Sequence, residues 1–171
     1  YVTDRDNEFD RLATLNLKTK KISYFTSAIP WEVSGYTLSK DKSKIAFETN
    51  ESGLNKLYLM DTNSKKYSEI KGLPVGLVNN FDFTDDGKSL FFSQSTYDSS
   101  ADIYRLDLAS GKIERWTDSE QGEMQKADMS QPKLIEWKSF DDMKITGFYY
   151  SFSKKFTGKR PVLINIHGGP E

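Results

Sequence analysis

The chain has 171 residues, of which 24 are basic and 25 acidic, giving a formal net charge of −1 at neutral pH. A balance of this kind indicates neither a nucleic-acid partner nor attraction to an anionic membrane. The absence of cysteine excludes disulfide bonds and thiolate metal sites.

The first residues, YVTDRD, read as the inside of a strand, so we expect the N-terminus to be truncated. The compartment therefore stays unknown, cytoplasmic or periplasmic. Aromatic residues make up 13% of the chain, which favours strands over helices.

Three stretches with one plan follow each other along the chain. Each alternates apolar and polar residues, reaches a polar turn and enters a short strand, and Leu15, Met60 and Leu106 hold corresponding places 45 or 46 residues apart. A period of about 40–45 residues with four short strands per unit is typical of a β-propeller blade. Turn residues such as Gly87 and Gly111 tolerate the positive φ that tight turns need.

We therefore predict two complete four-stranded blades, over residues 33–70 and 78–117, preceded by the last three strands of an earlier blade within residues 1–26. The chain is predicted to be all-β: an incomplete β-propeller of about two and a half blades, followed by the first strands of a second domain. A closed ring usually needs about 4–8 blades.

An incomplete ring should leave at least two blade faces without partners, so we expect self-association through these faces. We also expect Trp31, Trp116 and Trp137 to pack between blades rather than to form a ligand surface.

The repeat stops after Thr117. Residues 1–121 are assigned to the propeller fragment, and the polar, unpatterned residues 122–132 to a linker. Residues 133–171 have a different texture and are assigned to the start of a second domain.

This second part begins with a predicted hairpin, with strands over residues 134–139 and 144–152. The run PVLINI, residues 161–166, is apolar nearly throughout, which indicates a strand covered on both faces. It leads directly into His167, Gly168 and Gly169.

A buried strand that runs into His-Gly-Gly is the setting of an oxyanion-hole loop, although an ordinary strand-to-loop turn is the alternative. In such a loop a backbone N–H faces the developing negative charge, and a Cβ would obstruct it. Taken in order, the segments TDDGKSLFF, PKLIEWKSFDDMKITGFYY and GKRPVLINIHGGPE resemble the prolyl oligopeptidase family of serine peptidases. The resemblance is strongest to its acylaminoacyl-peptidase or dipeptidyl-aminopeptidase branch.

The resemblance implies a propeller set over an α/β-hydrolase domain that hydrolyses short peptides, with the propeller restricting access. It implies that Gly169 offers its backbone N–H to the oxyanion and that His167 and Gly168 shape the loop. His167 is the sole histidine, but the family's base histidine follows the nucleophile in the chain, so we interpret His167 as a loop residue. No cofactor is implied, and the expected partner is a short peptide substrate.

The sequence departs from this family in one respect: it contains no Gly-x-Ser-x-Gly motif. The nearest approach, Gly87-Lys88-Ser89, has Phe91 where the second glycine belongs. Without nucleophile, acid and base we expect the chain alone to be inactive. Two alternatives stay open: a non-catalytic propeller scaffold with a vestigial hydrolase-like tail, and an esterase of the same fold.

Overall fold

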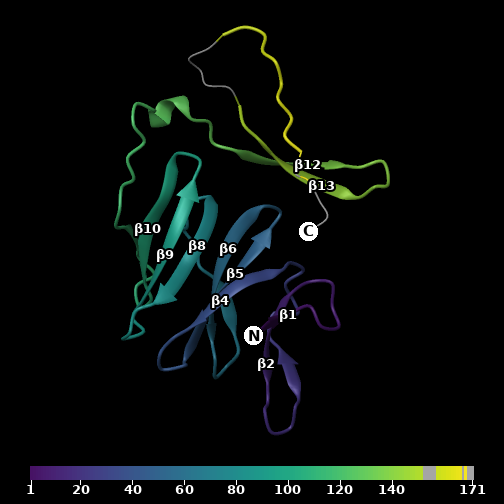
Figure 1. Cartoon of the computed structure of the whole chain (residues 1–171), viewed down its shortest axis with the longest axis vertical. Helices are drawn as coiled ribbons and strands as arrows, with labels where there is room; N and C mark the ends of the chain where they lie inside the picture. Colours follow the sequence, from purple (N-terminus) through teal and green to yellow (C-terminus); the bar gives the residue numbers. More distant parts are fainter. Residues whose placement is uncertain (152–156, 167, 169–171) are drawn as a thin grey trace.

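The computed structural model describes residues 1–151, 157–166 and 168 (Figure 1). Over these residues the chain is all-β, apart from one short 3₁₀ helix, as predicted. The elements are β1 (Val2–Thr3), β2 (Arg11–Leu15), β3 (Ile22–Tyr24), β4 (Val33–Leu38), β5 (Lys44–Glu51), β6 (Leu54–Asp61), β7 (Tyr67–Glu69), β8 (Gly76–Phe83), β9 (Ser89–Thr96), β10 (Ser99–Asp107), β11 (Ile113–Arg115), η1 (Lys126–Asp128), β12 (Lys133–Lys138) and β13 (Lys144–Tyr149).

Three antiparallel sheets follow each other in chain order and stand side by side (Figure 1). The first is the three-stranded sheet β1–β3, and the next two are the four-stranded sheets β4–β7 and β8–β11. Each sheet runs through its strands in sequence, which is the meander of a propeller blade. The predicted count of two complete blades and three strands of an earlier one is confirmed.

The three sheets share one register, which makes their positions directly comparable. The first residue after the last strand of each blade donates its backbone N–H to the third-strand carbonyl: Phe25 to Leu12 at 2.9 Å, Ile70 to Leu57 at 2.8 Å and Trp116 to Ile103 at 2.8 Å. Equivalent residues can therefore be identified from pairing rather than from sequence similarity.

The hydrophobic core lies between neighbouring blades rather than inside any one of them. One cluster joins the first and second sheets and includes Leu12, Phe47 and Met60. The other joins the second and third sheets and includes Leu57 and Phe92. Because a strand alternates its side chains between two faces, the middle blade β4–β7 contributes to both clusters.

Polar side chains shape the turns that connect the third and fourth strands of each blade. Asp61 accepts a hydrogen bond from the backbone N–H of Ser64 at 2.7 Å, and Asp107 accepts one from that of Ser110 at 2.9 Å. Asn16 does the same for Thr19 at 3.0 Å. Such Asx turns mimic a backbone turn and explain why a short acid or amide recurs here.

Strands β12 and β13 form the predicted hairpin, with Leu134 opposite Phe148. The second strand was predicted to run to residue 152, but β13 ends at Tyr149; Tyr150 and Ser151 lie outside any strand, and Phe152 lies outside the described residues. The hairpin contacts the blades through Phe148, whose ring lies over Gly53 at the β5–β6 turn. Gly53 has a φ of +82°, and a Cβ there would come within 2.8 Å of that ring, so glycine meets both requirements.

Two of the three tryptophans lie where the sequence analysis did not expect them. Trp31 packs against the cluster between the first and second sheets, as predicted. Trp116 is 60% exposed on the outer face of the third sheet, and Trp137 is 48% exposed on the hairpin. The prediction of packing between blades is wrong for these two, because no blade among the described residues covers the face that carries Trp116.

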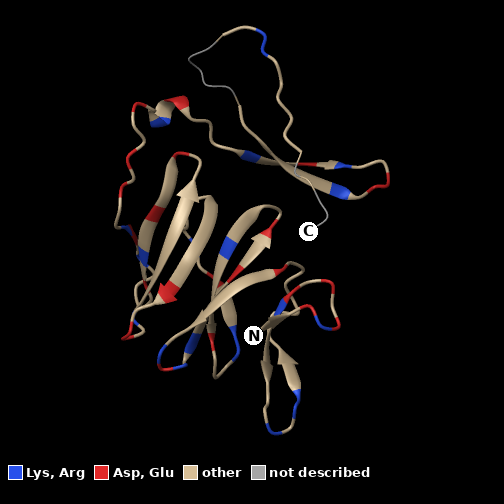
Figure 2. Ribbon diagram, in the orientation of Figure 1, with Lys and Arg blue, Asp and Glu red and all other residues tan. Residues whose placement is uncertain are grey.

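Charged residues of both signs are scattered over all three blades and the hairpin (Figure 2). No helix among the described residues is long and apolar enough to cross a membrane.

Candidate functional site

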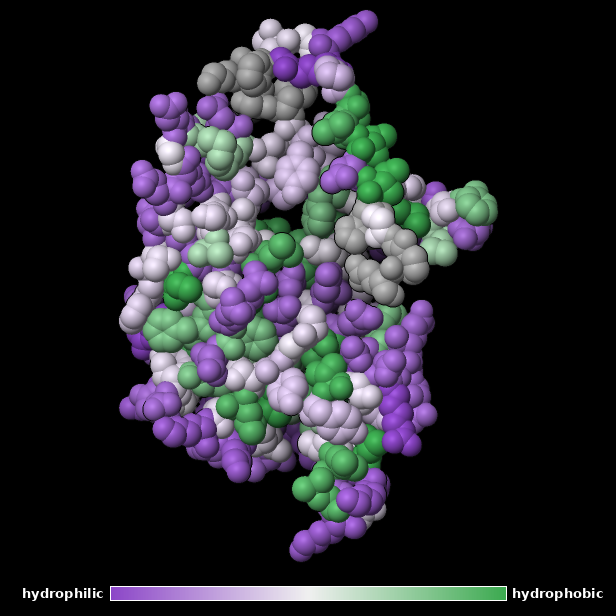
Figure 3. Space-filling view, in the orientation of Figure 1, coloured by the Kyte–Doolittle hydropathy of each residue, from purple (hydrophilic) through white to green (hydrophobic). Residues whose placement is uncertain are grey.

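The apolar run at residues 161–166 was predicted to be a buried strand, and the structure differs. These residues form no strand, and the side chains of Val162, Leu163, Ile164 and Ile166 are at least 77% exposed. Figure 3 shows a run of hydrophobic surface along this segment. A strand needs a neighbour for its backbone hydrogen bonds, and within the described residues none pairs with it.

Two of the three residues assigned to the oxyanion loop, His167 and Gly169, lie outside the described residues. Gly168 is exposed, and a Cβ placed on it would meet nothing within 4 Å. The oxyanion role of the Gly169 N–H therefore stays a prediction.

A hollow of about 840 Å³ lies between the end of β13 and residues 158–165. Its lining includes Tyr149, Tyr150, Arg160 and Asn165 beside the aliphatic Leu163. Phenol, guanidinium and amide groups can hydrogen-bond to the backbone of a bound peptide. This hollow is the described cavity nearest in sequence to the predicted oxyanion loop.

A second, mostly apolar cavity of about 330 Å³ separates the hairpin from the blades. Its blade side includes Leu54, Val75 and Tyr97, and its hairpin side includes Phe148 and Tyr150. The cavity therefore lies where the propeller meets the second part of the chain.

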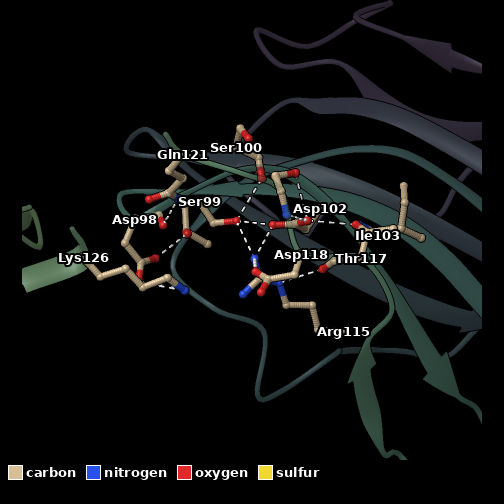
Figure 4. Close-up of polar contacts among 12 residues, drawn as sticks. Asp98, Ser99, Ser100, Asp102, Ile103, Arg115, Thr117, Asp118, Gln121 and Lys126 are labelled. Carbon is tan, nitrogen blue, oxygen red and sulfur yellow. Dashed lines mark hydrogen bonds and ion pairs between the residues drawn. The ribbon is translucent and has the colours of Figure 1, made fainter. Parts of the chain in front are cut away.

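Among the described residues, the most deeply buried charged group lies elsewhere, on β10 of the third blade (Figure 4). The Asp102 carboxylate is fully buried and accepts hydrogen bonds from the Ser99 hydroxyl, from Arg115 at 2.5 Å and from Thr117 Oγ1 at 2.8 Å. Ser119 adds its backbone N–H at 2.8 Å and its hydroxyl at 3.0 Å.

Burial alone would raise the pKa of Asp102. The hydrogen bonds from Ser99, Thr117 and Arg115 outweigh burial and hold the pKa well below its usual value, so the carboxylate is ionised at neutral pH.

The same cluster fastens the chain that leaves the blade. Arg115 also pairs with Asp118 at 2.6 Å, and Gln121 donates to the carbonyl of Asp98. Lys126 of η1 approaches the Asp98 carboxylate at 4.0 Å. The network thus holds residues 118–121, which directly precede the predicted linker, against the blade, and Lys126 is the linker residue that approaches it (Figure 4).

Although it contains a serine and a carboxylate, this cluster is not a catalytic triad. A serine nucleophile needs a neutral base to accept its proton. Here the Ser99 hydroxyl donates its hydrogen bond to the Asp102 carboxylate, which is already paired with the Arg115 guanidinium. No group of three or more histidine or acidic side chains among the described residues is placed to hold a metal ion. The cluster is structural.

Sequence reasoning missed this cluster. The available signal was a lone acid at an alternating position of a strand, where the equivalent residues of the other blades are Arg11 and Lys56. Periodicity alone did not predict that Arg115 would pair with Asp102.

No family model and no curated protein matches the chain. Solved structures do match. Prolyl oligopeptidase B from Galerina marginata, without ligand, aligns with a TM-score of 0.70 at 14% identity, covering 90% of this chain and 22% of that one. A puromycin-hydrolysing peptidase from Mycobacterium tuberculosis aligns with a TM-score of 0.67 at 13% identity, covering 83% and 22%.

TolB from Acinetobacter baumannii, whose name mentions no peptidase activity, aligns with a TM-score of 0.56 at 17% identity, covering 88% of this chain and 40% of that one. The chain spans about a fifth of the length of the peptidases it matches. At these identities the likeness establishes the fold alone: the chain has the β-propeller architecture found in prolyl oligopeptidases.

Proposed function

We propose that this chain forms the junction between the propeller and the catalytic domain of a serine peptidase of the prolyl oligopeptidase type. The peptidase would hydrolyse short peptides by acylaminoacyl or dipeptidyl release. The observation that carries the proposal is the order of parts: propeller blades, a hairpin docked on the blades through Phe148, and an apolar run ending in His-Gly-Gly.

In this proposal residues 133–171 open an α/β-hydrolase domain. Val162, Leu163, Ile164 and Ile166 would enter its central sheet. Burying their exposed apolar side chains on both faces of that sheet would stabilise the fold. The Gly169 N–H would donate to the oxyanion, and His167 and Gly168 would hold the loop open. The 171 residues contain no Gly-x-Ser-x-Gly motif, and therefore no nucleophilic serine with its acid and base. The chain alone would not hydrolyse peptides.

The blades would limit the size of the substrate. The apolar cavity between hairpin and blades and the hollow beside β13 both lie where a peptide would pass between propeller and catalytic domain. The choice between acylated and free peptides would be made by residues outside the two cavities.

The experiment compares the 171-residue chain with the longest product of the reading frame that contains it. Both are treated with a fluorophosphonate probe and with acylaminoacyl and dipeptidyl p-nitroanilides. We expect the longer product to be labelled and to release nitroaniline, and the chain alone to do neither. A longer product that takes up no label would overturn the peptidase proposal.

The oxyanion role is tested in the active product by Gly169→Pro, which removes the N–H. We expect kcat to fall by about 10²–10³-fold, whereas Lys159→Ala at an exposed position should leave it unchanged. A change confined to KM would contradict the assignment.

A second candidate is a non-catalytic interaction scaffold. The match to TolB favours it, because it shows that these blades also resemble a protein not named as a peptidase. The same labelling experiment separates the two, since a scaffold would stay unlabelled at any length.

A further inference from the structure

A polar hollow of about 370 Å³ lies where β4 and β5 of the second blade meet β8 of the third. Its lining includes Ser34 and Glu48 from the second blade, and Asn79, Asn80 and Phe81 from β8. Two neighbouring blades of this chain supply these five residues. The hollow is distinct from the two cavities beside the hairpin.

A β-bulge in β8 shapes this hollow. The register between β8 and β9 shifts between Asn79 and Asp82, and Asn80 has a φ of +45°, which asparagine adopts more readily than most residues. Consecutive side chains of a regular strand point to opposite faces, whereas residues 79–81 all line one cavity because the bulge re-aims them. The side-chain amides of Asn79 and Asn80 have no hydrogen-bond partner among the described residues, so their oxygens are available as acceptors.

Glu48 is the charged residue of this lining, and only one of its two carboxylate oxygens is occupied. The Ser34 hydroxyl and Nδ2 of Asn55 both donate to Oε1, each at 2.9 Å. Among the described residues nothing donates to Oε2, and no lysine or arginine pairs with this carboxylate. Glu48 is nevertheless partly buried, and burial raises its pKa. An unpaired carboxylate in such a place costs stability.

The architecture of the blade does not require an acid at this position. Glu48 lies opposite Leu57 in the second blade, and the equivalent residue of the third blade, opposite Ile103, is Ser93. Glu51, on the same strand as Glu48, is paired with Lys56 at 2.6 Å. A charge that costs stability and that neither packing nor an ion pair explains is typical of a binding site.

We propose that this hollow binds a primary ammonium group, with Glu48 as its counter-ion. An ammonium is a compact charge with three N–H donors. Oε2 of Glu48 and the side-chain oxygens of Asn79 and Asn80 line the same hollow and can accept from them. The ammonium belongs either to the amino terminus of a peptide or to a lysine side chain.

The occupied oxygen makes the site selective. A guanidinium forms its strong, parallel pair of hydrogen bonds with both oxygens of a carboxylate, and here Ser34 and Asn55 already occupy Oε1. We therefore expect the hollow to prefer ammonium to guanidinium. This inference does not depend on the peptidase proposal, because a peptidase and a scaffold could both use such a site.

The test is a titration of the isotope-labelled 171-residue chain at neutral pH, followed by NMR signals of residues 79 and 80. Three probes are compared: Nα-acetyl-lysine amide with a side-chain ammonium, norleucine amide with an α-ammonium, and Nα-acetyl-arginine amide with a guanidinium. We expect at least one ammonium probe to bind about 10-fold or more tightly than the arginine probe. The ammonium probe that binds identifies the source, and the uncharged Nα-acetyl-norleucine amide should not bind.

Variants assign the binding to Glu48. Glu48→Gln should weaken the ammonium complex by about 10-fold or more, and Glu51→Gln, the matched control on the same strand, should leave it unchanged. Circular dichroism checks that both variants fold. The double variant Ser34→Ala with Asn55→Ala frees Oε1 and should raise the affinity for the arginine probe relative to the ammonium probe.

Three results would overturn the proposal. They are a wild-type chain that binds neither ammonium probe, an ammonium complex that survives Glu48→Gln, and a wild-type chain that binds the arginine probe as tightly as the ammonium probes. The last comparison needs no variant, so it tests the site even if Glu48→Gln fails to fold.

Discussion

The blades β4–β7 and β8–β11 share one register, and each joins its third and fourth strands by an ion pair. The acid and the base stand on exchanged strands in the two blades. In β8–β11 the fully buried Asp102 pairs with Arg115 at 2.5 Å. At the equivalent positions of β4–β7, Lys56 and Glu69 lie 4.0 Å apart, with side chains 35% and 27% exposed. The blades also differ in coverage: among the described residues β4–β7 is packed on both faces and β8–β11 on one.

This difference separates what a blade requires from what it tolerates. Stacked aromatic pairs recur in both, Phe47 on Tyr58 at 5.0 Å and Phe92 on Tyr104 at 5.6 Å, because the face that packs on the preceding blade needs apolar area. The polar pair between the third and fourth strands can exchange the positions of its acid and its base, provided that both partners change together. The predictions below test this division.

The largest expected effect comes from the buried pair. Asp102→Ala leaves Arg115 without its partner and removes the acceptor for Ser99, Thr117 and Ser119, so we expect the free energy of unfolding to fall by about 3–5 kcal/mol. Lys56→Ala in the other blade should cost about 1 kcal/mol or less, because Lys56 is 35% exposed and both of its ion pairs, with Glu51 at 2.6 Å and with Glu69 at 4.0 Å, are partly open to solvent. Urea unfolding at a fixed protein concentration measures both, and equal losses would contradict the comparison.

The second prediction concerns coverage. Leu57→Ala removes a fully buried side chain from the cluster between blades and should cost about 2–5 kcal/mol. The equivalent Ile103→Ala should cost about 1 kcal/mol in the monomer, because no blade among the described residues lies over it. Equal losses for Leu57→Ala and Ile103→Ala would contradict this comparison.

The third prediction compares glycines in the first strands of the two blades. A Cβ at Gly76 would lie 1.9 Å from the Ser95 carbonyl oxygen, so Gly76→Ala must displace backbone and should cost about 1–3 kcal/mol. At Gly35 the nearest atom would be 3.8 Å away on the Phe81 ring. Gly35→Ala should therefore stay within about 0.5 kcal/mol of wild type in the same thermal or urea assay.

The last prediction concerns the pH dependence of stability. The shifted carboxyl of one blade should lose its contribution to stability as the pH falls, and that of the other as the pH rises. The pKa of Asp102 is lowered in the folded state, so its contribution to stability is present above about pH 4 and is lost as the pH falls below that value. Burial raises the pKa of Glu48 in the second blade, so its contribution is complete below about pH 4.5 and is lost as the pH rises through the folded pKa.

Unfolding measured between pH 2 and 8 should therefore give Asp102→Asn a flatter acid limb than wild type. Glu48→Gln should gain stability relative to wild type as the pH rises above 4.5. Profiles for both variants that run parallel to wild type would refute these assignments.

Much of the blade architecture was predictable from the chain. Leu15, Met60 and Leu106 mark a repeat whose spacing specifies the strands and their order, because a meander pairs only neighbours along the chain. The hairpin of β12 and β13 was predictable for the same local reason.

The failures involve contacts between distant residues. Trp116 looked like a core residue by type, and only the position of the neighbouring blades shows that its face is uncovered. Residues 161–166 have the composition of a buried strand, but composition supplies no partner, and the structure leaves them exposed. Of the predicted oxyanion residues, only Gly168 lies among the described ones.

By itself, then, the sequence determined the strands, their turns and the number of blades. These depend on alternation and on turn chemistry within about ten residues, and both act locally. Tertiary structure decided which faces are covered and that Asp102 is buried against Arg115 across two strands. Burial is a property of what lies opposite a side chain, and that is known only once the sheets are stacked.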